Sequence, residues 1–326
     1  MVFVTGGTGF LGSTLIKLLT DQGVAVLAIK RENSVIPETL ISSSLIQWVD
    51  ADITDYFALS DIFGGITQVY HCSAMISYQP QDYAAMLHTN IEGTKHIVNL
   101  CLEHNARLVH VSSIATLGVS KKGELLTEDS KWDDGADNSK YAVSKYESEM
   151  EVWRGIVEGL DAVIVNPSVI MGIGAGTKGS GVIFKMVQQG LKIYPPGTVG
   201  IVDVDDVAKI MIVLMNLVDI SGERFILNSE NLTNKDLLER IATLLNKPFP
   251  TVEAKPFMLS VAWRAAKLVA LIKRERPSLT RDAAKAAASK LAYSNKKVTD
   301  TTGYTFKAVD VTLQEISLKL NPKTIH

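Results

Sequence analysis

The chain has 326 residues, of which 46% are hydrophobic, so it is long enough for one large domain or two unequal ones with a buried core. Its 33 lysines and arginines nearly balance 35 aspartates and glutamates, and the net charge of −2 gives no overall basic excess for nucleic acid or an anionic membrane. The two cysteines, Cys72 and Cys101, stand outside any metal-binding spacing, which predicts a reducing, cytoplasmic location and no metal site.

Strand-like and helical patterns alternate over the first half of the chain. The strand-like runs are VFVT, VAVLAIK, IQWVDADI, QVYHCSA, ARLVHVSS and DAVIVNPSVI. Helical patterns lie between them, at 12–22, 82–104 and 141–159. Runs this apolar are typical of strands buried on both faces, so we expect an α/β fold with a parallel sheet flanked by helices.

The alternation breaks after Gly172. Glycine-rich and proline-containing loops follow, then the run GERFILN resembles a late strand, and from Asn231 the chain is mostly helical. This pattern predicts a nucleotide-binding domain over 1–172, to which 199–229 returns. The remaining segments, 173–198 and 230–326, would form a smaller, discontinuous, mostly helical substrate domain.

The longest apolar stretch runs from Phe257 to Ile272. It has 16 residues and contains Arg264 and Lys267, so it is too short and too charged to span a bilayer. Two interpretations stay open for this segment: an amphipathic helix on a membrane surface, or a helix that covers a pocket.

The first turn of the chain is rich in glycine. Gly6, Gly9 and Gly12 follow the first strand and open the first helix. Glycine tolerates positive φ, and the missing Cβ lets a pyrophosphate approach the backbone beside the free N–H groups of a helix N-terminus. In this context the spacing predicts a dinucleotide site, against the alternative of a tight turn without a ligand.

The end of the second strand bears on the choice of dinucleotide. A carboxylate there would bind the ribose hydroxyls of NAD, whereas a cation would bind the 2′-phosphate of NADP. Lys30 and Arg31 occupy this place, which favours NADP(H) with NAD(H) as the alternative; two solvated surface cations are the other interpretation. Asp52 and Ile53 follow the third strand, where they would flank the adenine.

Tyr141 and Lys145 are four residues apart on a predicted helix and so share a face. An ammonium near a phenol stabilises the phenolate and makes tyrosine a usable acid or base, although such pairs also occur on ordinary helix surfaces. Ser112 and Ser113 end the fifth strand, at the edge where doubly wound sheets bind ligands. Strand alternation allows one of these hydroxyls to face the cleft.

These motifs, with NPSVIMG and VDVDDVA, resemble the extended short-chain dehydrogenase/reductase family over essentially the whole chain. The resemblance implies a Rossmann-type doubly wound parallel sheet, an NAD(P) cofactor and a Ser-Tyr-Lys triad. Ser113 would hold the substrate oxygen, Tyr141 would be the acid or base, and Lys145 would hold the nicotinamide ribose. Asn90 matches an asparagine that supports the lysine through water. The helices at 82–104 and 141–159 imply a homodimer.

The cofactor contacts expected on these grounds lie in the glycine turn and at the ends of the strands that follow it. They are Gly6, Thr8, Gly9, Phe10, Leu11, Gly12, Lys30, Arg31, Asp52, Ile53, Cys72, Ser73, Ala74, Ser112, Tyr141, Lys145, Pro167, Ser168 and Val169.

Departures from the family pattern help to select a branch. The related dehydratases carry an Asp-Glu pair directly after the serine, where this chain has Ile114 and Ala115. Sugar-nucleotide enzymes usually carry an Arg-Asp pair where this chain has Val199 and Gly200, and a diphosphate needs positive partners. Arg224 and Lys178 are the cations left to compensate, so this branch stays open.

The chain most resembles the dihydroflavonol reductase and 3β-hydroxysteroid dehydrogenase-like branch. Phe257, Met258 and Trp263 would line an apolar pocket or pack on the first domain. We therefore expect NADPH-dependent reduction of a ketone or aldehyde on an apolar small molecule. The alternatives are a sugar-nucleotide 4-epimerase with tightly bound NAD and a non-catalytic NADP-binding protein.

Overall fold

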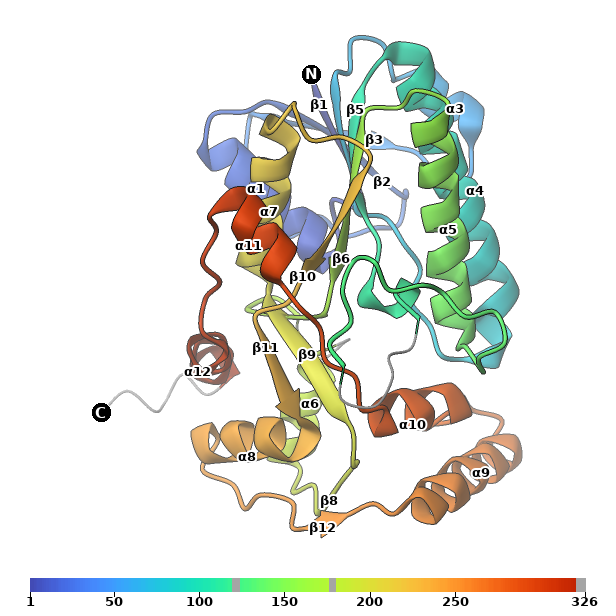
Figure 1. Cartoon of the computed structure of the whole chain (residues 1–326), viewed down its shortest axis with the longest axis vertical. Helices are drawn as coiled ribbons and strands as arrows, with labels where there is room; N and C mark the ends of the chain where they lie inside the picture. The colour runs from blue at the N-terminus through green and yellow to red at the C-terminus, as the bar shows by residue number, and fades with distance from the viewer. Residues whose placement is uncertain (119–123, 176–179, 321–326) are drawn as a thin grey trace.

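A seven-stranded parallel sheet lies at the centre of the computed structural model, which describes residues 1–118, 124–175 and 180–320 (Figure 1). Its strands are β1 (Val2–Thr5), β2 (Val26–Lys30), β3 (Ile46–Asp50), β4 (Gln68–His71), β5 (Arg107–Val111), β6 (Ala162–Pro167) and β10 (Glu223–Leu227). They lie side by side in the order β10-β6-β5-β4-β1-β2-β3. The order in which strands are added reverses between β1 and β4: β2 and β3 lie on one side of β1, and the later strands lie on the other. Doubly wound sheets bind their ligands at such a switch point. The predicted Rossmann-type α/β fold is confirmed.

Helices cover both faces of this sheet (Figure 1). One face carries α1 (Phe10–Asp21) and α7 (Val204–Asn216), whose apolar side chains pack on alternate residues of the strands. The other face carries α4 (Tyr83–His104) and α5 (Lys140–Val157), which pack on the residues between them. The strands are thus buried on both sides, which explains why they read as continuous apolar runs.

Short elements complete this half of the chain. They are α2 (Glu38–Ile41), α3 (Tyr56–Ser60) and the 3-10 turns η1 (Pro80–Asp82) and η2 (Ile114–Thr116).

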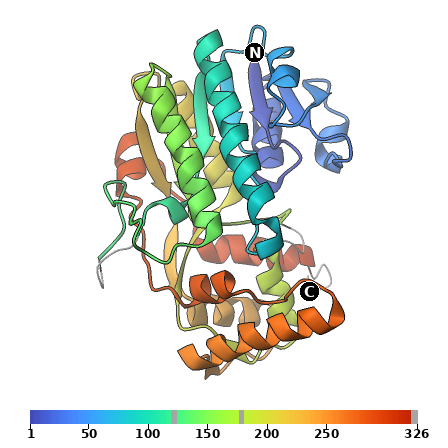
Figure 2. The ribbon, with the colours of Figure 1, turned by 90° about the vertical axis from the view of Figure 1, so that its right-hand side faces the viewer.

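A second, smaller lobe lies below the carboxyl edge of the sheet (Figure 2). It holds a three-stranded sheet in the order β11-β9-β7, and a pair formed by β8 and β12. The strands are β7 (Val169–Met171), β8 (Ile193–Tyr194), β9 (Thr198–Asp203), β11 (Glu230–Thr233) and β12 (Val252–Glu253). The helices of the C-terminal region are α6 (Gly181–Gln188), α8 (Asn234–Leu244), α9 (Pro256–Lys273), α10 (Arg281–Ala288), α11 (Lys296–Thr302) and α12 (Val309–Leu320). The C-terminal region is helical, as predicted.

The segment 199–229 contributes to both sheets. Its first part, β9, lies in the three-stranded sheet, whereas α7 packs on the large sheet and β10 completes the edge of that sheet beside β6. Within the described residues, no helix combines the length and apolar character needed to cross a membrane.

Candidate active site

The glycine turn between β1 and α1 presents bare backbone. Gly6 has a φ of +68°, and a Cβ there would lie 2.8 Å from the Ser73 amide nitrogen. A Cβ on Gly12 would overlap the Gly6 carbonyl, so the turn closes only with glycine at both places. Gly9 precedes α1 and supplies no side-chain acceptor to its first turn. The N–H groups of that turn, which includes Phe10 and Leu11, are thus available to an anion.

The segment after β4 lies directly against this turn. The Ser73 N–H donates to Thr5 Oγ1 at 3.2 Å, and the same hydroxyl hydrogen-bonds His71 Nδ1 at 2.7 Å. Burial lowers the pKa of His71 to about 3, so its ring is neutral. These contacts bring Cys72 and Ser73 beside the glycine turn.

Lys30 and Arg31 have different surroundings. Lys30 is paired in register with Asp50 of β3, and its ammonium donates to that carboxylate. Arg31 is exposed, and no ion pair in the described part of the chain engages it. Partial burial raises the pKa of Asp52, but two hydrogen bonds from Thr54 and the charge of Arg31 outweigh burial and lower it overall. Of the two cations, Arg31 is therefore the one without an ion-pair partner among the described residues.

Ile53 occupies a different environment from Asp52. It is buried and packs against Gly93 of α4, where a Cβ would overlap the isoleucine side chain. The glycine thus permits close packing between α4 and the segment after β3.

The structure brings Ser113, Tyr141 and Lys145 together at the carboxyl end of β5. The Ser139 hydroxyl accepts from the Ala142 N–H at 3.1 Å and starts α5, so Tyr141 lies in the first turn of the helix. One turn later, Lys145 Nζ donates to the Val111 carbonyl at 2.9 Å. The Ser113 hydroxyl accepts from the Ala115 N–H at 3.1 Å.

Burial controls the electrostatics of this cluster. It raises the pKa of Tyr141, and a hydrogen bond from the Ser113 side chain acts in the opposite direction. Burial lowers the pKa of Lys145 to about 8, although the charge of Glu149 opposes the shift. Desolvated groups with shifted pKa values at the carboxyl edge of a parallel sheet are typical of a catalytic site.

Asn90 connects the two halves of the site. Its Oδ1 accepts from the Met75 N–H at 2.7 Å, and its Nδ2 donates to the Met75 carbonyl at 3.0 Å and to Ser144 Oγ at 3.1 Å. Asn90 thus joins the segment after β4 to α5 next to Lys145, through Ser144.

Ser168 has a buried hydroxyl at the junction of two strands. It follows Pro167, which ends β6, and precedes Val169, which begins β7. Its side chain is buried, yet within the described residues Oγ has no hydrogen-bond partner. Buried hydroxyls are normally satisfied, so Ser168 Oγ is a candidate partner for a polar group of a cofactor. The glycine turn and this hydroxyl both suit a nicotinamide dinucleotide.

Sequence reasoning missed Glu149, which is fully buried on α5. Its carboxylate accepts hydrogen bonds from Ser112 Oγ, Thr116 Oγ1, Trp153 Nε1, Asn166 Nδ2 and Arg224 Nη1. The hydroxyl of Ser112 is therefore directed at Glu149, and only Ser113 lies beside Tyr141. The signal was present, because Glu149 is four residues after Lys145 on the same helix face.

Arg224, a candidate partner for a substrate diphosphate, is engaged elsewhere. Besides Glu149, its guanidinium donates to the backbone carbonyls of Glu128 and Ser130. Lys178, the other candidate, lies outside the described residues.

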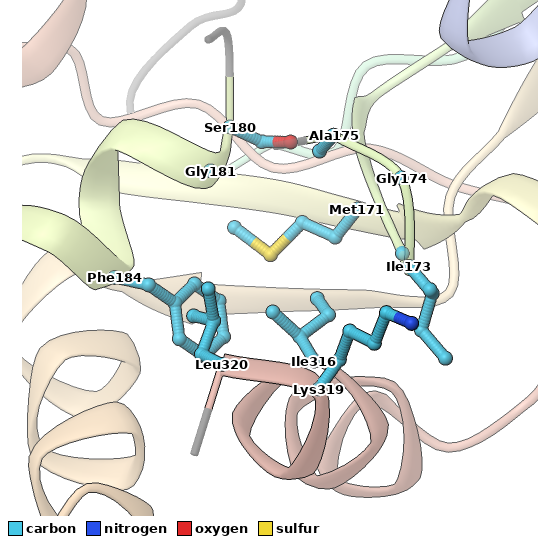
Figure 3. Close-up of a pocket in the computed structure, with 11 residues that line it drawn as sticks. Met171, Ile173, Gly174, Ala175, Ser180, Gly181, Phe184, Ile316, Lys319 and Leu320 are labelled. Carbon is cyan, nitrogen blue, oxygen red and sulfur yellow. The ribbon is translucent and has the colours of Figure 1, made fainter. Parts of the chain in front are cut away.

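An apolar cavity of about 180 Å³ lies apart from the candidate triad (Figure 3). Met171 and Phe184 line it from β7 and α6, and Ile316 closes it from α12. Ser113, Tyr141 and Lys145 are not among its lining residues, so it is separate from the site described above.

A doubly wound sheet with a glycine turn at its switch point and a buried Tyr-Lys pair beside it defines an NAD(P)-dependent oxidoreductase. The chain belongs to the NAD dependent epimerase/dehydratase family, whose model matches residues 2–227. The predicted family is confirmed.

Three curated relatives of the chain carry reductase or demethylase names. It is 30% identical to a putative dihydroflavonol 4-reductase of Synechocystis sp., over 92% of this chain and 89% of the relative. It is 29% identical to cinnamoyl-CoA reductase 1 of Petunia hybrida, covering 77% and 78% of the two chains. It is 27% identical to sterol demethylase protein B of Methylococcus capsulatus, covering 78% of each.

Solved structures support the fold. The crystal structure of gox2253 matches with a TM-score of 0.85 at 24% identity, covering 100% of this chain and 99% of the other. A UDP-glucose 4-epimerase of Thermotoga maritima matches with a TM-score of 0.80 at 18% identity, covering 99% of both chains. At these identities the likeness shows the fold alone.

Proposed function

We propose that this protein reduces a ketone or aldehyde group of a small apolar molecule with NADPH. The observation that carries the proposal is the convergence of three side chains: the Tyr141 phenol beside the Ser113 hydroxyl, with the Lys145 ammonium fixed on the end of β5. The reductase names of the relatives support this reaction class.

The chemistry divides between the cofactor and the three side chains. NADPH supplies the hydride. Ser113 donates a hydrogen bond to the substrate carbonyl oxygen, and Tyr141 transfers its proton to that oxygen. Because burial raises the pKa of Tyr141, the phenol holds its proton at neutral pH and suits the role of donor. The Lys145 ammonium binds the nicotinamide ribose and stabilises the phenolate that remains.

Cofactor choice follows from the charges at the end of β2. Arg31 takes the 2′-phosphate of NADP, because Lys30 already donates to Asp50. The backbone of the glycine turn holds the pyrophosphate, and Ser168 Oγ donates to or accepts from a polar group near the nicotinamide.

One feature argues against binding of a sugar nucleotide, and a second argues against dehydration of one. Arg224 is engaged by Glu149 and by backbone carbonyls, so it has little capacity to bind a diphosphate. Ile114 and Ala115 follow Ser113 and carry no acid or base for water loss.

The test compares Tyr141→Phe with Tyr146→Phe. Tyr146 stacks on Trp132 at 4.3 Å between ring centroids and serves as the matched control on the same helix. With NADPH and a panel of aromatic and alicyclic aldehydes and ketones, Tyr141→Phe should lose about 10²- to 10⁴-fold in turnover. It should still bind NADPH in calorimetry, and Tyr146→Phe should behave as the unaltered protein.

Other outcomes identify the alternatives. Normal turnover by Tyr141→Phe contradicts the assigned mechanism. Interconversion of UDP-glucose and UDP-galactose by protein purified with bound NAD, without carbonyl reduction, indicates the 4-epimerase. Binding of NADPH without turnover of any carbonyl or UDP-sugar indicates a non-catalytic protein.

A further inference from the structure

Helix α9 presents one apolar face to the protein and a second one to solvent. On the first face Ala270 is buried, and Leu259 and Trp263 are half-buried. The second face is exposed by between 62% and 75% at Phe257, Val261, Leu268, Leu271 and Ile272. At 3.6 residues per turn these five positions form a single stripe along the helix. An amphipathic helix of a globular domain normally exposes its polar side, so the arrangement here calls for a partner.

The apolar surface extends beyond α9. Helix α9 lies at the end of the molecule that also holds the β8–β12 pair (Figures 1 and 2). Ile193 of β8 and Val252 of β12 are exposed there, as is Phe249 just before β12. We call these residues and the stripe of α9 the α9 edge. A second hollow lies beside Trp132 and Tyr146. Described residues of α9 line neither this hollow nor the cavity of Figure 3, so the edge is not the wall of either.

The α9 edge is also strongly cationic, although the whole chain has a net charge of −2. Helix α9 contains no acidic residue. In the helix and within three residues of its ends, the cations are Lys255, Arg264, Lys267, Lys273, Arg274 and Arg276, against two acids, Glu253 and Glu275. Among the described residues, Arg276 is the one of these cations that forms an ion pair, with Asp82. The other five cations have no carboxylate at ion-pair distance in the described part of the chain.

We propose that the α9 edge docks on the surface of an anionic phospholipid bilayer. A helix with an apolar stripe, flanking cations and aromatic residues lies in the plane of the headgroups. Arg264 lies within the stripe, and its aliphatic stem allows the guanidinium to reach the lipid phosphates. The docking is peripheral, because α9 is too short and too charged to cross the membrane.

A second copy of the chain fits this surface less well. An isologous contact would bring the Arg264 and Lys267 charges of two α9 helices together, and the helix offers no carboxylate to pair with them. An anionic surface matches the same charges and takes up the apolar stripe as well. Charge complementarity therefore selects the bilayer over self-association.

The position of α9 connects this surface to the candidate active site. The link from α9 to α10 is anchored beside that site. Gln79 Nε2 donates to the Pro277 carbonyl of this link at 3.0 Å, and Gln79 follows Tyr78 in the chain. The rings of Tyr78 and Tyr141 lie 5.8 Å apart. Docking would hold this side of the molecule close to solutes dissolved in the membrane. The docking itself does not depend on the reaction proposed above.

Vesicle flotation tests the proposal. Full-length protein is mixed with phosphatidylcholine vesicles that contain or lack phosphatidylglycerol. Each cation near an anionic surface raises partitioning by about fivefold, so three give about a hundredfold preference for the anionic vesicles at low salt. Raising the salt to about 1 M, where the Debye length is about 3 Å, should release the protein. Absence of flotation with anionic vesicles at low salt, or equal flotation with neutral ones, overturns the proposal.

Paired variants then locate the surface. Leu268→Glu with Ile272→Glu places two carboxylates in the exposed stripe and should reduce the vesicle-bound fraction at least tenfold. Val157→Glu with Val218→Glu makes the same change in charge at two exposed apolar sites, the last residue of α5 and a residue just after α7, and should leave binding intact. Circular dichroism and thermal unfolding verify that both variants are folded.

Two results of this comparison exclude docking through the α9 edge. If the Leu268/Ile272 variant floats as well as the unaltered protein, another surface binds the vesicles. If sedimentation shows a dimer that the same variant abolishes, and vesicles are not bound, the occupant of the edge is a second copy of the chain.

Discussion

Replacing Lys145 with methionine should stabilise the cofactor-free protein while abolishing turnover. Burial lowers the pKa of Lys145 from 10.5 to about 8. Each pKa unit is worth about 1.4 kcal/mol, so holding the buried charge costs about 3 kcal/mol of stability at neutral pH. Methionine avoids this cost but loses the hydrogen bond to the Val111 carbonyl, worth about 1 kcal/mol. The net gain is about 2 kcal/mol, or roughly 3 °C in Tm for a chain of this length.

The pH dependence separates this explanation from a general packing effect. Below about pH 8 the folded and unfolded chains both carry the proton on Lys145, and the full cost is present. Between about pH 8 and 10.5 the unfolded chain binds the proton and the folded chain does not, so the stability of the unaltered protein rises with pH. The methionine variant lacks this rise, and its advantage should shrink across that range.

Calorimetric unfolding of both proteins without cofactor, at neutral pH and near pH 10, measures the effect. A variant that is less stable than the unaltered protein at neutral pH would refute the reasoning. So would an advantage that stays constant as the pH is raised, because it would arise from packing rather than from the buried charge.

Two further substitutions test the site. Arg31→Ala should weaken NADPH binding by about 10- to 100-fold in calorimetry and leave NADH binding nearly unchanged. Lys30→Ala should have the smaller effect, because Asp50 already engages the Lys30 ammonium. An equal loss of affinity for both cofactors argues against a 2′-phosphate contact. Glu149→Ala should destabilise the protein by about 3–5 kcal/mol in denaturant unfolding, because Arg224 loses its buried partner. The exposed Glu147→Ala on the same helix should change stability by less than about 0.5 kcal/mol.

Features that depend on local spacing were predictable from the sequence. The glycine turn follows from three positions beside one strand, and the shared face of Tyr141 and Lys145 follows from the helical repeat alone. The parallel sheet follows from its doubly buried strands. Each of these rests on residues close together in the chain.

Features that depend on register between distant segments were not predictable. Lys30 meets Asp50 because β2 and β3 pair at that position, and nothing in either strand alone indicates it. The engagement of Arg224 requires β10 to lie beside α5, which only the assembled sheet provides. The same applies to β9, which pairs with β7 and β11 from both sides across intervening loops and helices. The homodimer and the domain boundaries stay predictions.

The place of β10 in the sheet has a consequence for biosynthesis. β10 pairs with β6, yet 55 residues separate the end of one strand from the start of the other. While the ribosome adds that segment, β1 to β6 can assemble in chain order, but the outer edge of β6 has no neighbour. Its backbone groups, and apolar side chains such as Val163 and Val165, are then open to other nascent chains. This edge is open to misassembly during that interval, and the pairing of β10 with β6 covers it.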